Sequence, residues 1–396
     1  MTIPLARPFF GPEEAAAVQD VLASGWVSQG PKVEEFEQRL AATLRCREVI
    51  AVNSGTSAIM LTLRALDIGP GDSVIVPAFT CAATALPVLE TGAQPLFADI
   101  DPATNNVTWS TIARVLRKNT KAVIAAHMFG RVCDIQSIAA ECRRQRLYLI
   151  EDAALALGAQ AKGQLAGTFG VAGCFSFHPR KILTTGEGGA VCTNDARLAA
   201  RVRASRNYGA ARTAWARFRA RDGSPQGFSR MAFNCKLTDL QAAVGLVQLQ
   251  RLPDFLNHRR HLARRYTELL SSCAPLALPS LPSAEGEHVF QAYVCGWLPA
   301  AFDELAKRPA RLRSACKGLG AFKTMLNGAG VAVSDAAQFL PELPVFGHKP
   351  SRRQCPYAFI ASRVMFALPI YHGMTNSNVT TVAAAVQRAI GAIASE

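Results

Sequence analysis

The sequence predicts an α/β protein with a large domain in which a mixed, mostly parallel sheet of seven strands lies between helices. Between residue 10 and about residue 250, short apolar and β-branched runs alternate with helical segments, the pattern of a parallel sheet wrapped by helices. The expected strands are residues 49–52, 73–79, 94–100, 121–129, 147–152, 173–177 and 189–194. Too few residues separate the last two strands for a crossover helix, so we expect them to pair antiparallel.

Apolar residues with helical spacing mark the segments around these strands. The expected helices are residues 11–25, 31–45 and 56–66, and then 237–272 as one or two long helices. Because helices separate most of the strands, both faces of the sheet are expected to be covered.

The last third of the chain predicts a second, smaller α+β domain. A Pro-rich stretch at 274–283 predicts a linker. A strand at 290–298, a basic stretch at 308–323 and a helix from Val379 follow it. The extreme N-terminus is able to pack against this smaller domain. The expected domains are residues 1–250 and 251–396.

The composition narrows the class of protein. The 396 residues are 49% hydrophobic, enough for two cores. The chain contains no apolar run of about 18 residues and no secretory pattern at its start, so we expect no membrane association. The 11 cysteines include no CxxC pair, which predicts neither a disulfide framework nor a metal site and favours a reducing cytoplasm.

The formal charge of +14 raises the question of nucleic-acid binding. The excess is spread as arginine, and its local clusters are not interleaved with aromatic residues, so we expect no nucleic-acid partner. An arginine-rich solvated surface is the simple interpretation. Attraction of an anionic small substrate is the functional alternative.

A polar turn between the first strand and the next helix is a candidate phosphate site. The segment "VNSGTSA" places Ser54, Gly55 and Thr56 there, with hydroxyls and free backbone N–H groups at a positive helix end. The turn lacks the spacing of a nucleotide P-loop, which favours a monophosphate. An ordinary helix cap is the alternative interpretation.

Two acids, Glu151 and Asp152, end the strand at 147–152. Strand ends of open parallel sheets face the ligand crevice, where a carboxylate can pair with a cationic ring nitrogen. Neighbouring side chains on a strand point to opposite faces, so one of the two acids is expected to reach the crevice. A helix N-cap is the alternative role.

Lys181 lies in "FSFHPRKILTTGEGGAV", between a strand and a glycine cluster. Most lysines are solvated, but this chain uses arginine far more often than lysine. Unlike arginine, a partly buried lysine can lose its proton and form a Schiff base. A phosphate site, an acid at a strand end and a lysine on a neighbouring turn together meet the requirements of pyridoxal phosphate.

At these residues the chain resembles the DegT/StrS family of pyridoxal-phosphate sugar aminotransferases, which have the aspartate aminotransferase fold, or fold type I. Nine blocks match in order, among them "SGWVSQGPKVEEFE", "VNSGTSA", "LIEDAALALGA", "FSFHPRKILTTGEGGAV" and "NCKLTDLQAAVGLVQL". The family's dehydratases carry histidine at the lysine position, and this chain keeps Lys181 with His178 three residues before it. Transamination is therefore favoured over dehydration.

The resemblance assigns roles to individual residues. It makes Lys181 the Schiff-base lysine, Asp152 the partner of the pyridine nitrogen, and Ser176 a phosphate ligand with the residues of the polar turn. It implies a homodimer in which Asn234 reaches the phosphate of the partner's site. The further residues expected near substrate are Trp26, His178, Glu187 and Lys236, with Glu187 alternatively tying down its turn.

The chain departs from the family pattern at three positions. Leu155 stands where glutamine or histidine is common near the cofactor's phenolic oxygen. Cys81 stands where an aromatic residue often stacks on the ring. Lys236 stands where the family usually has an arginine, at the end of the block that begins with Asn234. These three departures leave the residues expected to carry the reaction in place. They can alter the electronic properties of the cofactor or the choice of substrate.

The expected reaction moves an amino group, from L-glutamate as the expected donor, to a nucleotide-linked keto-sugar of the 4-keto-6-deoxy type. The product would be an amino sugar for a surface polysaccharide or a secondary metabolite. Two alternatives are an enzyme acting on a cyclitol or aminohydroxybenzoate-type precursor and a non-catalytic, regulatory pyridoxal-phosphate protein.

Overall fold

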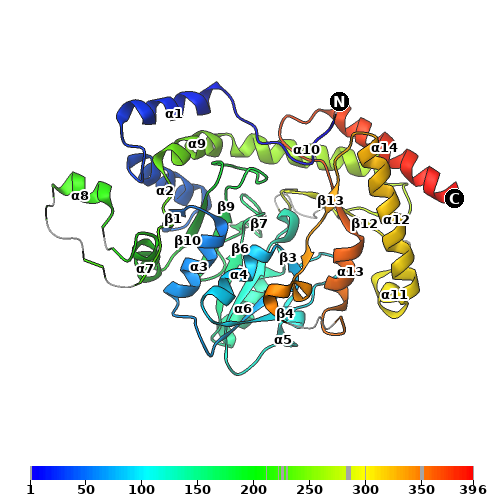
Figure 1. Cartoon of the computed structure of the whole chain (residues 1–396), viewed down its shortest axis with the longest axis horizontal. Helices are drawn as coiled ribbons and strands as arrows, with labels where there is room; N and C mark the ends of the chain where they lie inside the picture. The colour runs from blue at the N-terminus through cyan, green and yellow to red at the C-terminus, as the bar shows by residue number, and fades with distance from the viewer. Residues whose placement is uncertain are drawn as a thin grey trace.

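A computed structural model shows a large sheet and a smaller sheet, each covered by helices (Figure 1). The structure describes residues 2–210, 212–221, 223, 227–228, 231–281, 287–298, 300–347 and 352–395. The two sheets lie side by side, and the long helix α10 (Leu252–Leu270) runs along both of them (Figure 1). This arrangement is the predicted α/β fold with a smaller α+β part.

The large sheet contains the seven predicted strands in the order β1-β10-β9-β6-β5-β2-β4. Their bounds are β1 Glu48–Val52, β2 Ser73–Pro77, β4 Gln94–Ala98, β5 Thr120–Ala126, β6 Tyr148–Asp152, β9 Ala172–Ser176 and β10 Gly189–Thr193. All pairs from β9 to β4 are parallel, whereas β10 pairs antiparallel with both β9 and β1. The predicted antiparallel pairing of the last two strands is confirmed.

Helices cover both faces of this sheet because successive strand residues point to opposite sides. On β1, Val49 and Ala51 pack into the cluster with α2 and α9, whereas Ile50 and Val52 pack into the cluster with α3 and α7. The helices of this part are α1 Pro12–Ser24, α2 Pro31–Leu44, α3 Gly55–Ala65, α4 Leu86–Glu90, α5 Trp109–Ala113, α6 Ile135–Arg144, α7 Ala196–Arg206, α8 Ala214–Ala220 and α9 Asp239–Gln250.

Three predicted strands end two or three residues earlier than expected, and the strand predicted at 94–100 is one of them, since it ends at Ala98. The strand predicted at 121–129 ends at Ala126, because Phe129 adopts φ +60° in a short 3₁₀ turn. The strand predicted at 73–79 ends at Pro77, and Phe79–Thr80 forms a separate strand β3 that pairs with β14 (Gln338–Phe339). The remaining short elements are β7 Gln160–Ala161, β8 Gln164–Leu165, η1 Ala82–Thr84, η2 Met128–Gly130, η3 Leu340–Glu342 and η4 Pro344–Phe346.

The smaller sheet is antiparallel, with the order β11-β12-β15-β13. Its elements are β11 Leu276–Ala277, β12 Tyr293–Trp297, β13 Ser334–Asp335, β15 Met365–Leu368, α11 Phe302–Lys307, α12 Pro309–Gly328, α13 Pro356–Val364 and α14 Asn376–Ser395. Ile3, near the N-terminus, forms a β-bridge with Val331 beside this sheet.

The linker predicted at 274–283 is partly wrong. Leu276 and Ala277 form edge strand β11, paired with β12, and Leu276 and Leu278 pack against the core of the smaller sheet. Apolar residues between the prolines therefore override the loop-forming tendency of proline. Positions 282–283 of that stretch lie outside the described residues.

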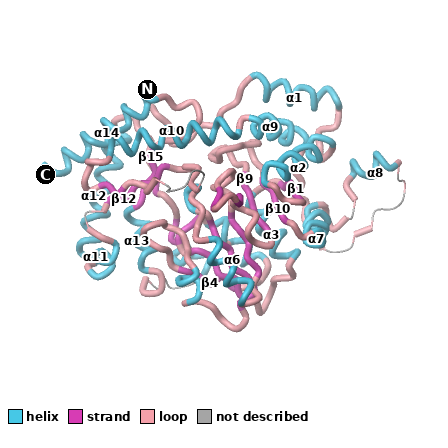
Figure 2. Tube along the Cα trace, turned by 180° about the vertical axis from the view of Figure 1, so that it is seen from behind, coloured by secondary structure: helices cyan, strands magenta, loops and turns pink. Residues whose placement is uncertain are grey.

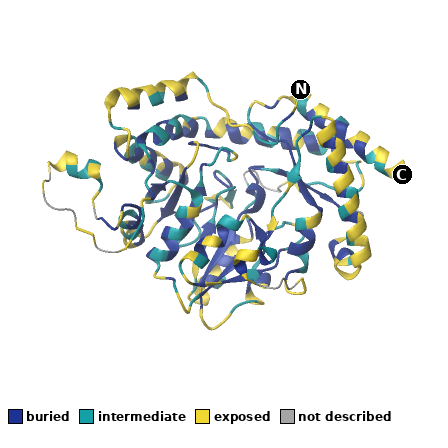
Figure 3. Ribbon diagram, viewed as in Figure 1, coloured by how far each residue is buried: buried dark blue, intermediate teal, exposed yellow. Residues whose placement is uncertain are grey.

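Two peripheral helices expose most of their surface. Helix α8 stands away from the body, at the end of the molecule opposite the C-terminus (Figure 2). Much of α1 and α8 is exposed (Figure 3). Within the described ranges, no helix has the length and apolar character needed to cross a membrane.

Arg259, on α10, is a buried cation that joins three segments of the smaller part. Its Nη1 donates to the carbonyls of Phe290 at 3.2 Å, Gln291 at 3.2 Å and Ile370 at 3.1 Å. Its side chain has only 3% of its surface exposed. Without this donor, three carbonyl groups in a buried position would lose their partner.

We therefore expect Arg259→Met to lower the free energy of unfolding by about 3 kcal/mol, because unpaired buried carbonyls are costly. Urea unfolding would measure the loss. Arg265→Met is the matched control on the same helix. Among the described residues, the ion pair of Arg265 is an exposed one with Glu268, so its loss should cost under about 1 kcal/mol. Equal losses in the two variants would contradict the prediction.

Candidate active site

The predicted site residues meet at one edge of the large sheet. Strands β1, β9 and β6 all run in the same direction, since β10 is antiparallel to both β1 and β9. Their carboxyl ends therefore lie at the same edge, where ligands bind in open α/β sheets. Ser54 follows β1, Ser176 ends β9 and Asp152 ends β6.

The start of α3 forms the candidate phosphate site. The Ser54 side chain caps the helix by accepting a hydrogen bond from the Ser57 N–H at 3.0 Å. A Cβ on Gly55 would come within 2.8 Å of the Ser176 Cβ, so glycine allows the helix start to touch the end of β9. First-turn N–H groups, with the hydroxyls of Thr56 and Ser176 nearby in the fold, suit a phosphate dianion.

The two neighbouring acids have different environments. Glu151 has no exposed surface, and its carboxylate accepts hydrogen bonds from four N–H donors. These are His127 Nε2 at 2.9 Å, Gly167 N at 2.7 Å, Phe169 N at 2.6 Å and Gly170 N at 2.8 Å. The side chain of Glu151 is thus fully used within the protein, and Asp152 is the acid left for a ligand.

Asp152 is held by one hydroxyl and one backbone amide. Its Oδ2 accepts from the Thr84 Oγ1 at 2.6 Å, and its Oδ1 accepts from the Ala154 N–H at 3.2 Å. Thr84 was not identified from the sequence. It lies 68 residues before Asp152, at the end of the matching block "GPGDSVIVPAFTCAAT", where only Cys81 was singled out.

Lys181 follows β9 on a tight turn, in which its N–H donates to the His178 carbonyl at 2.8 Å. Burial lowers the pKa of the Lys181 amine below its ordinary value, and the negative Asp152 carboxylate partly opposes this shift. Lower pKa values favour the neutral, nucleophilic amine. Lys181 therefore has the environment that a covalent amine requires.

A cavity of about 600 Å³ contains Lys181 and lies between the two sheets. Cys81, Leu155 and Arg180 line it from the large part of the chain. The smaller part contributes Gln291, residues 334–339 and residues 367–368. The sequence did not identify Gln291 as a site residue, although it lies at the start of the strand predicted at 290–298.

His178 and Glu187 lie on the same turn as Lys181, outside the residues that line its cavity. The Glu187 carboxylate is exposed and lies 3.9 Å from His178 Nε2. The Glu187 carbonyl accepts from Thr185 Oγ1 and from Gln241 Nε2, each at 2.7 Å. These bonds are made by the backbone of Glu187, so they hold the turn without using its carboxylate.

Trp26, Asn234 and Lys236 do not line the Lys181 cavity of the same chain. Lys236 lines a separate hollow of about 480 Å³ with Tyr208, and its ammonium lies 4.1 Å from the centre of the Tyr208 ring. Asn234 is exposed and bridges Asn207, while Trp26 packs against Trp215 of α8 at 4.9 Å. These residues form a second group, on the side of the molecule that carries α8.

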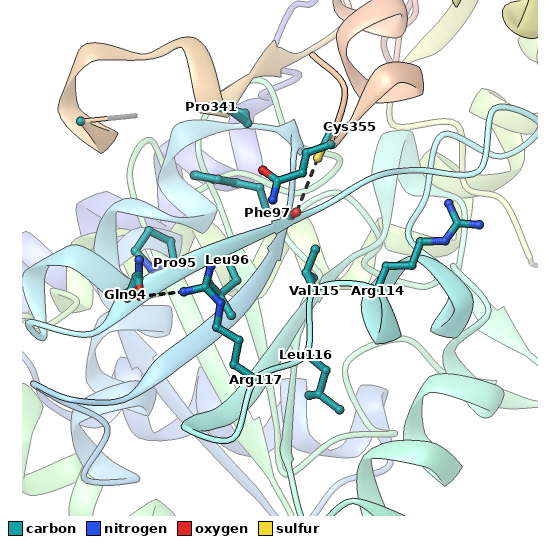
Figure 4. Close-up of a pocket in the computed structure, with 12 residues that line it drawn as sticks. Gln94, Pro95, Leu96, Phe97, Arg114, Val115, Leu116, Arg117, Pro341 and Cys355 are labelled. Carbon is teal, nitrogen blue, oxygen red and sulfur yellow. Dashed lines mark hydrogen bonds between the residues drawn. The ribbon is translucent and has the colours of Figure 1, made fainter. Parts of the chain in front are cut away.

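Another hollow, of about 440 Å³, lies at the outer edge of β4 (Figure 4). Arg117 Nη1 donates to Gln94 Oε1 at 3.2 Å, and the Cys355 thiol donates to the Phe97 carbonyl at 3.5 Å (Figure 4). None of the residues predicted for the site lines this hollow. Its one thiol, among the residues given for its lining, is that of Cys355, which is buried and bonded to the Phe97 carbonyl, so the candidate chemistry remains at Lys181.

Comparison with solved structures places this fold among the aminotransferases. The aminotransferase TlmJ from Streptoalloteichus hindustanus is 31% identical, with a TM-score of 0.88 over 99% of this chain and all of that chain. A candidate sugar aminotransferase of Streptococcus pneumoniae, solved in PLP and PMP forms, is 25% identical. Its PMP form has a TM-score of 0.89 over 99% of this chain and 100% of its own.

The chain belongs to the DegT/DnrJ/EryC1/StrS aminotransferase family, whose model matches residues 9–387. The spore coat polysaccharide biosynthesis protein SpsC of Bacillus subtilis is 34% identical, covering 97% of this chain and 96% of its own. The dTDP-4-dehydro-2,3,6-trideoxy-D-glucose 4-aminotransferase of Saccharopolyspora spinosa is also 34% identical, covering 98% and 97%. The predicted family is confirmed.

The residues at the sheet edge fit pyridoxal phosphate. The helix start and its hydroxyls suit the phosphate, a fixed carboxylate suits the ring nitrogen, and a buried amine suits the aldehyde. The close contact between Gly55 and Ser176 makes this donor set compact.

We predict that the extent to which the apoprotein combines with pyridoxal phosphate rises with pH and reaches half its maximum below pH 10.5. The ordinary pKa of lysine is 10.5, and burial lowers the pKa of Lys181. Asp152→Asn should move this pH lower still, since it removes the negative charge that stabilises the ammonium. Absorbance titration would measure both values. Glu187→Gln is the control and should leave the value unchanged, and an upward shift in Asp152→Asn would contradict the prediction.

Proposed function

We propose that this aminotransferase moves an amino group from L-glutamate to a nucleotide-linked 4-keto-6-deoxy sugar, with pyridoxal phosphate as its cofactor. The product would be an amino sugar for a surface polysaccharide or a secondary metabolite. The observation that carries the proposal is the position of Lys181 in the cavity, on the turn that follows β9, next to the strand that ends at Asp152. The two curated relatives support the substrate class, because one is a 4-aminotransferase of a dTDP-linked keto-sugar and the other a polysaccharide biosynthesis protein.

The protein side chains have separate tasks in this reaction. The bound cofactor supplies an electron sink that weakens the bonds at the amino-bearing carbon. Asp152 would hold the ring nitrogen in its protonated form, and Thr84 fixes the orientation of the carboxylate. Lys181, once released, would take a proton from the amino-bearing carbon at Nζ and return it at a neighbouring position.

The remaining residues would bind and orient the cofactor. Ser54, Gly55, Thr56 and Ser176 would hold the phosphate at the positive end of α3. Leu155 gives the cavity an apolar wall, which excludes water from the reacting atoms.

We further propose a homodimer in which each site is completed by the partner subunit. Two apolar side chains on and beside α8 are strongly exposed, namely Phe218 at 66% and Phe228 at 63%. Exposed apolar side chains gathered in this way are typical of protein interfaces. Trp26, Asn234 and Lys236 lie on the same side and would then serve the partner's site.

The transfer is tested in two half-reactions. Glutamate should convert the yellow, loaded protein to its pyridoxamine form, and a nucleotide-linked 4-keto-6-deoxyhexose should restore the yellow absorbance. Lys181→Ala should carry out neither conversion, and loss of its amine should lower the rate by at least about 1000-fold. A spectrum that ignores glutamate and other amino donors would instead support a non-catalytic role. Recovery with a cyclitol or aminohydroxybenzoate precursor alone would support the alternative acceptor.

If each active site contains residues from both subunits, two inactive variants should restore activity when they form mixed dimers. When Lys181→Ala and Asn234→Ala are co-expressed, each mixed dimer contains one site with neither change. Random mixing should restore about a quarter of the wild-type activity per total dimer. The two variants expressed separately are the controls. Co-expressed protein that is no more active than they are would show that Asn234 acts within its own subunit.

A further inference from the structure

Arg180 directly precedes Lys181 and lines the same cavity of about 600 Å³. The residue is exposed, so its charge is open to a ligand that enters the cavity. Burial lowers the pKa of the Lys181 amine below its ordinary value, and the positive charge of Arg180 contributes to the same shift. The guanidinium group therefore lies close enough to the amine to act on it through its charge.

The backbone of Arg180 is held from two sides. Its N–H donates to His178 Nδ1 at 3.2 Å, and its carbonyl accepts from Gln291 Nε2 at 2.5 Å. The first bond lies within the turn, and the second comes from the smaller part of the chain. Because the backbone makes both bonds, a change of the Arg180 side chain leaves them in place, and the starting point of that side chain is fixed.

The guanidinium group itself is free to bind. Among the residues that the structure describes, it has no hydrogen-bond or ion-pair partner. Its five N–H donors form a planar fork that matches the two oxygens of a carboxylate. A solvated surface arginine is the simple interpretation. The position of this arginine in the cavity, next to the candidate nucleophile, favours a ligand instead.

The acidic side chains that the smaller part contributes to the lining are already paired. Asp335 pairs with Lys323, which is not among the lining residues. Glu342 pairs with Arg363, and both of them line the cavity. These two carboxylates are therefore neutralised by other cations, and the charge of Arg180 is left for an anionic ligand.

We propose that Arg180 binds the carboxylate on the amino-bearing carbon of the amino donor, and so positions that carbon at Lys181. This inference rests on the proposed amino-acid donor. The carboxylate is bonded directly to the carbon at which Lys181 would act, whereas the sugar ring separates the diphosphate of the acceptor from its keto carbon. Since Arg180 is the neighbour of Lys181, its position favours the carboxylate. Such a pair can form two parallel charge-assisted hydrogen bonds.

Three amino donors separate the possible contacts in the first half-reaction. L-Glutamate has two carboxylates, L-glutamine keeps only the one on the amino-bearing carbon, and 4-aminobutyrate keeps only the distant one. Arg180→Gln removes the charge and retains the backbone bonds. Its second-order rate constant should fall about 30-fold for glutamate and by the same factor for glutamine, with little change for 4-aminobutyrate.

Arg143→Gln is the matched control. Arg143 is exposed on α6 and lies outside the lining of the cavity, so this variant removes one positive charge without touching the site. It should react with all three donors at wild-type rates. Arg180→Lys keeps the charge but loses the planar fork, and it should retain more of the glutamate rate than Arg180→Gln does. The half-reaction of Arg180→Gln with the keto-sugar should proceed at the wild-type rate.

Calorimetry with 2-methyl-L-glutamate provides a readout independent of turnover. A methyl group replaces the hydrogen that Lys181 would remove, so this compound binds without reacting further. Arg180→Gln should bind it about 30-fold more weakly than the wild-type protein does, and Arg143→Gln should bind it with wild-type affinity.

The outcomes separate this inference from the proposed function. A fall for glutamate but not for glutamine would place the distant carboxylate at Arg180, and a fall confined to the keto-sugar would place the diphosphate there. Either result would overturn the inference. Unchanged rates and affinity in Arg180→Gln would also overturn it and indicate a solvated arginine. A wild-type protein that reacts with no amino acid would contradict the proposed donor class, and the inference would fail with it.

Discussion

The candidate site depends on the buried carboxylate of Glu151. A fully buried charge is tolerated only when its lone pairs are satisfied, and Glu151 uses one imidazole and three backbone amides for this. These donors come from His127, at the end of β5, and from residues 167–170, before β9. The carboxylate thus joins the ends of neighbouring strands and fixes the β6 end, so that Asp152 faces the crevice.

A second constraint joins the smaller part of the chain to this edge. Gln291 bonds to the carbonyl of Arg180, and β14 pairs with β3 just before Cys81. Arg259 in turn holds the segment that carries Gln291. The wall facing Lys181 is therefore built by contacts between segments far apart in sequence, and a change in the smaller sheet can alter the geometry around the amine.

Local patterns were sufficient to predict the seven strands of the large sheet, the antiparallel last pair and the polar turn at Ser54. Apolar periodicity and glycine content act over a few residues, so a sequence reports them directly. The predictions that were wrong also have local causes. The strand from 121 was predicted too long because apolar residues continue through Phe129, whose backbone turns to positive φ. Residues 276–277 were taken for a linker because prolines surround them, although packing makes them a strand.

The sequence by itself determined the family, the fold class and the candidate roles of Lys181 and Asp152, because their motifs are short and ordered along the chain. Tertiary structure alone decided which of two adjacent acids stays free, which threonine holds it and which residues of the smaller part line the cavity. It also separated Trp26 and Lys236 from the Lys181 cavity. The physical reason is that hydrogen-bond satisfaction and burial depend on neighbours brought together by folding. The segments that contain Thr84 and Gln291 do not show which partners these side chains meet.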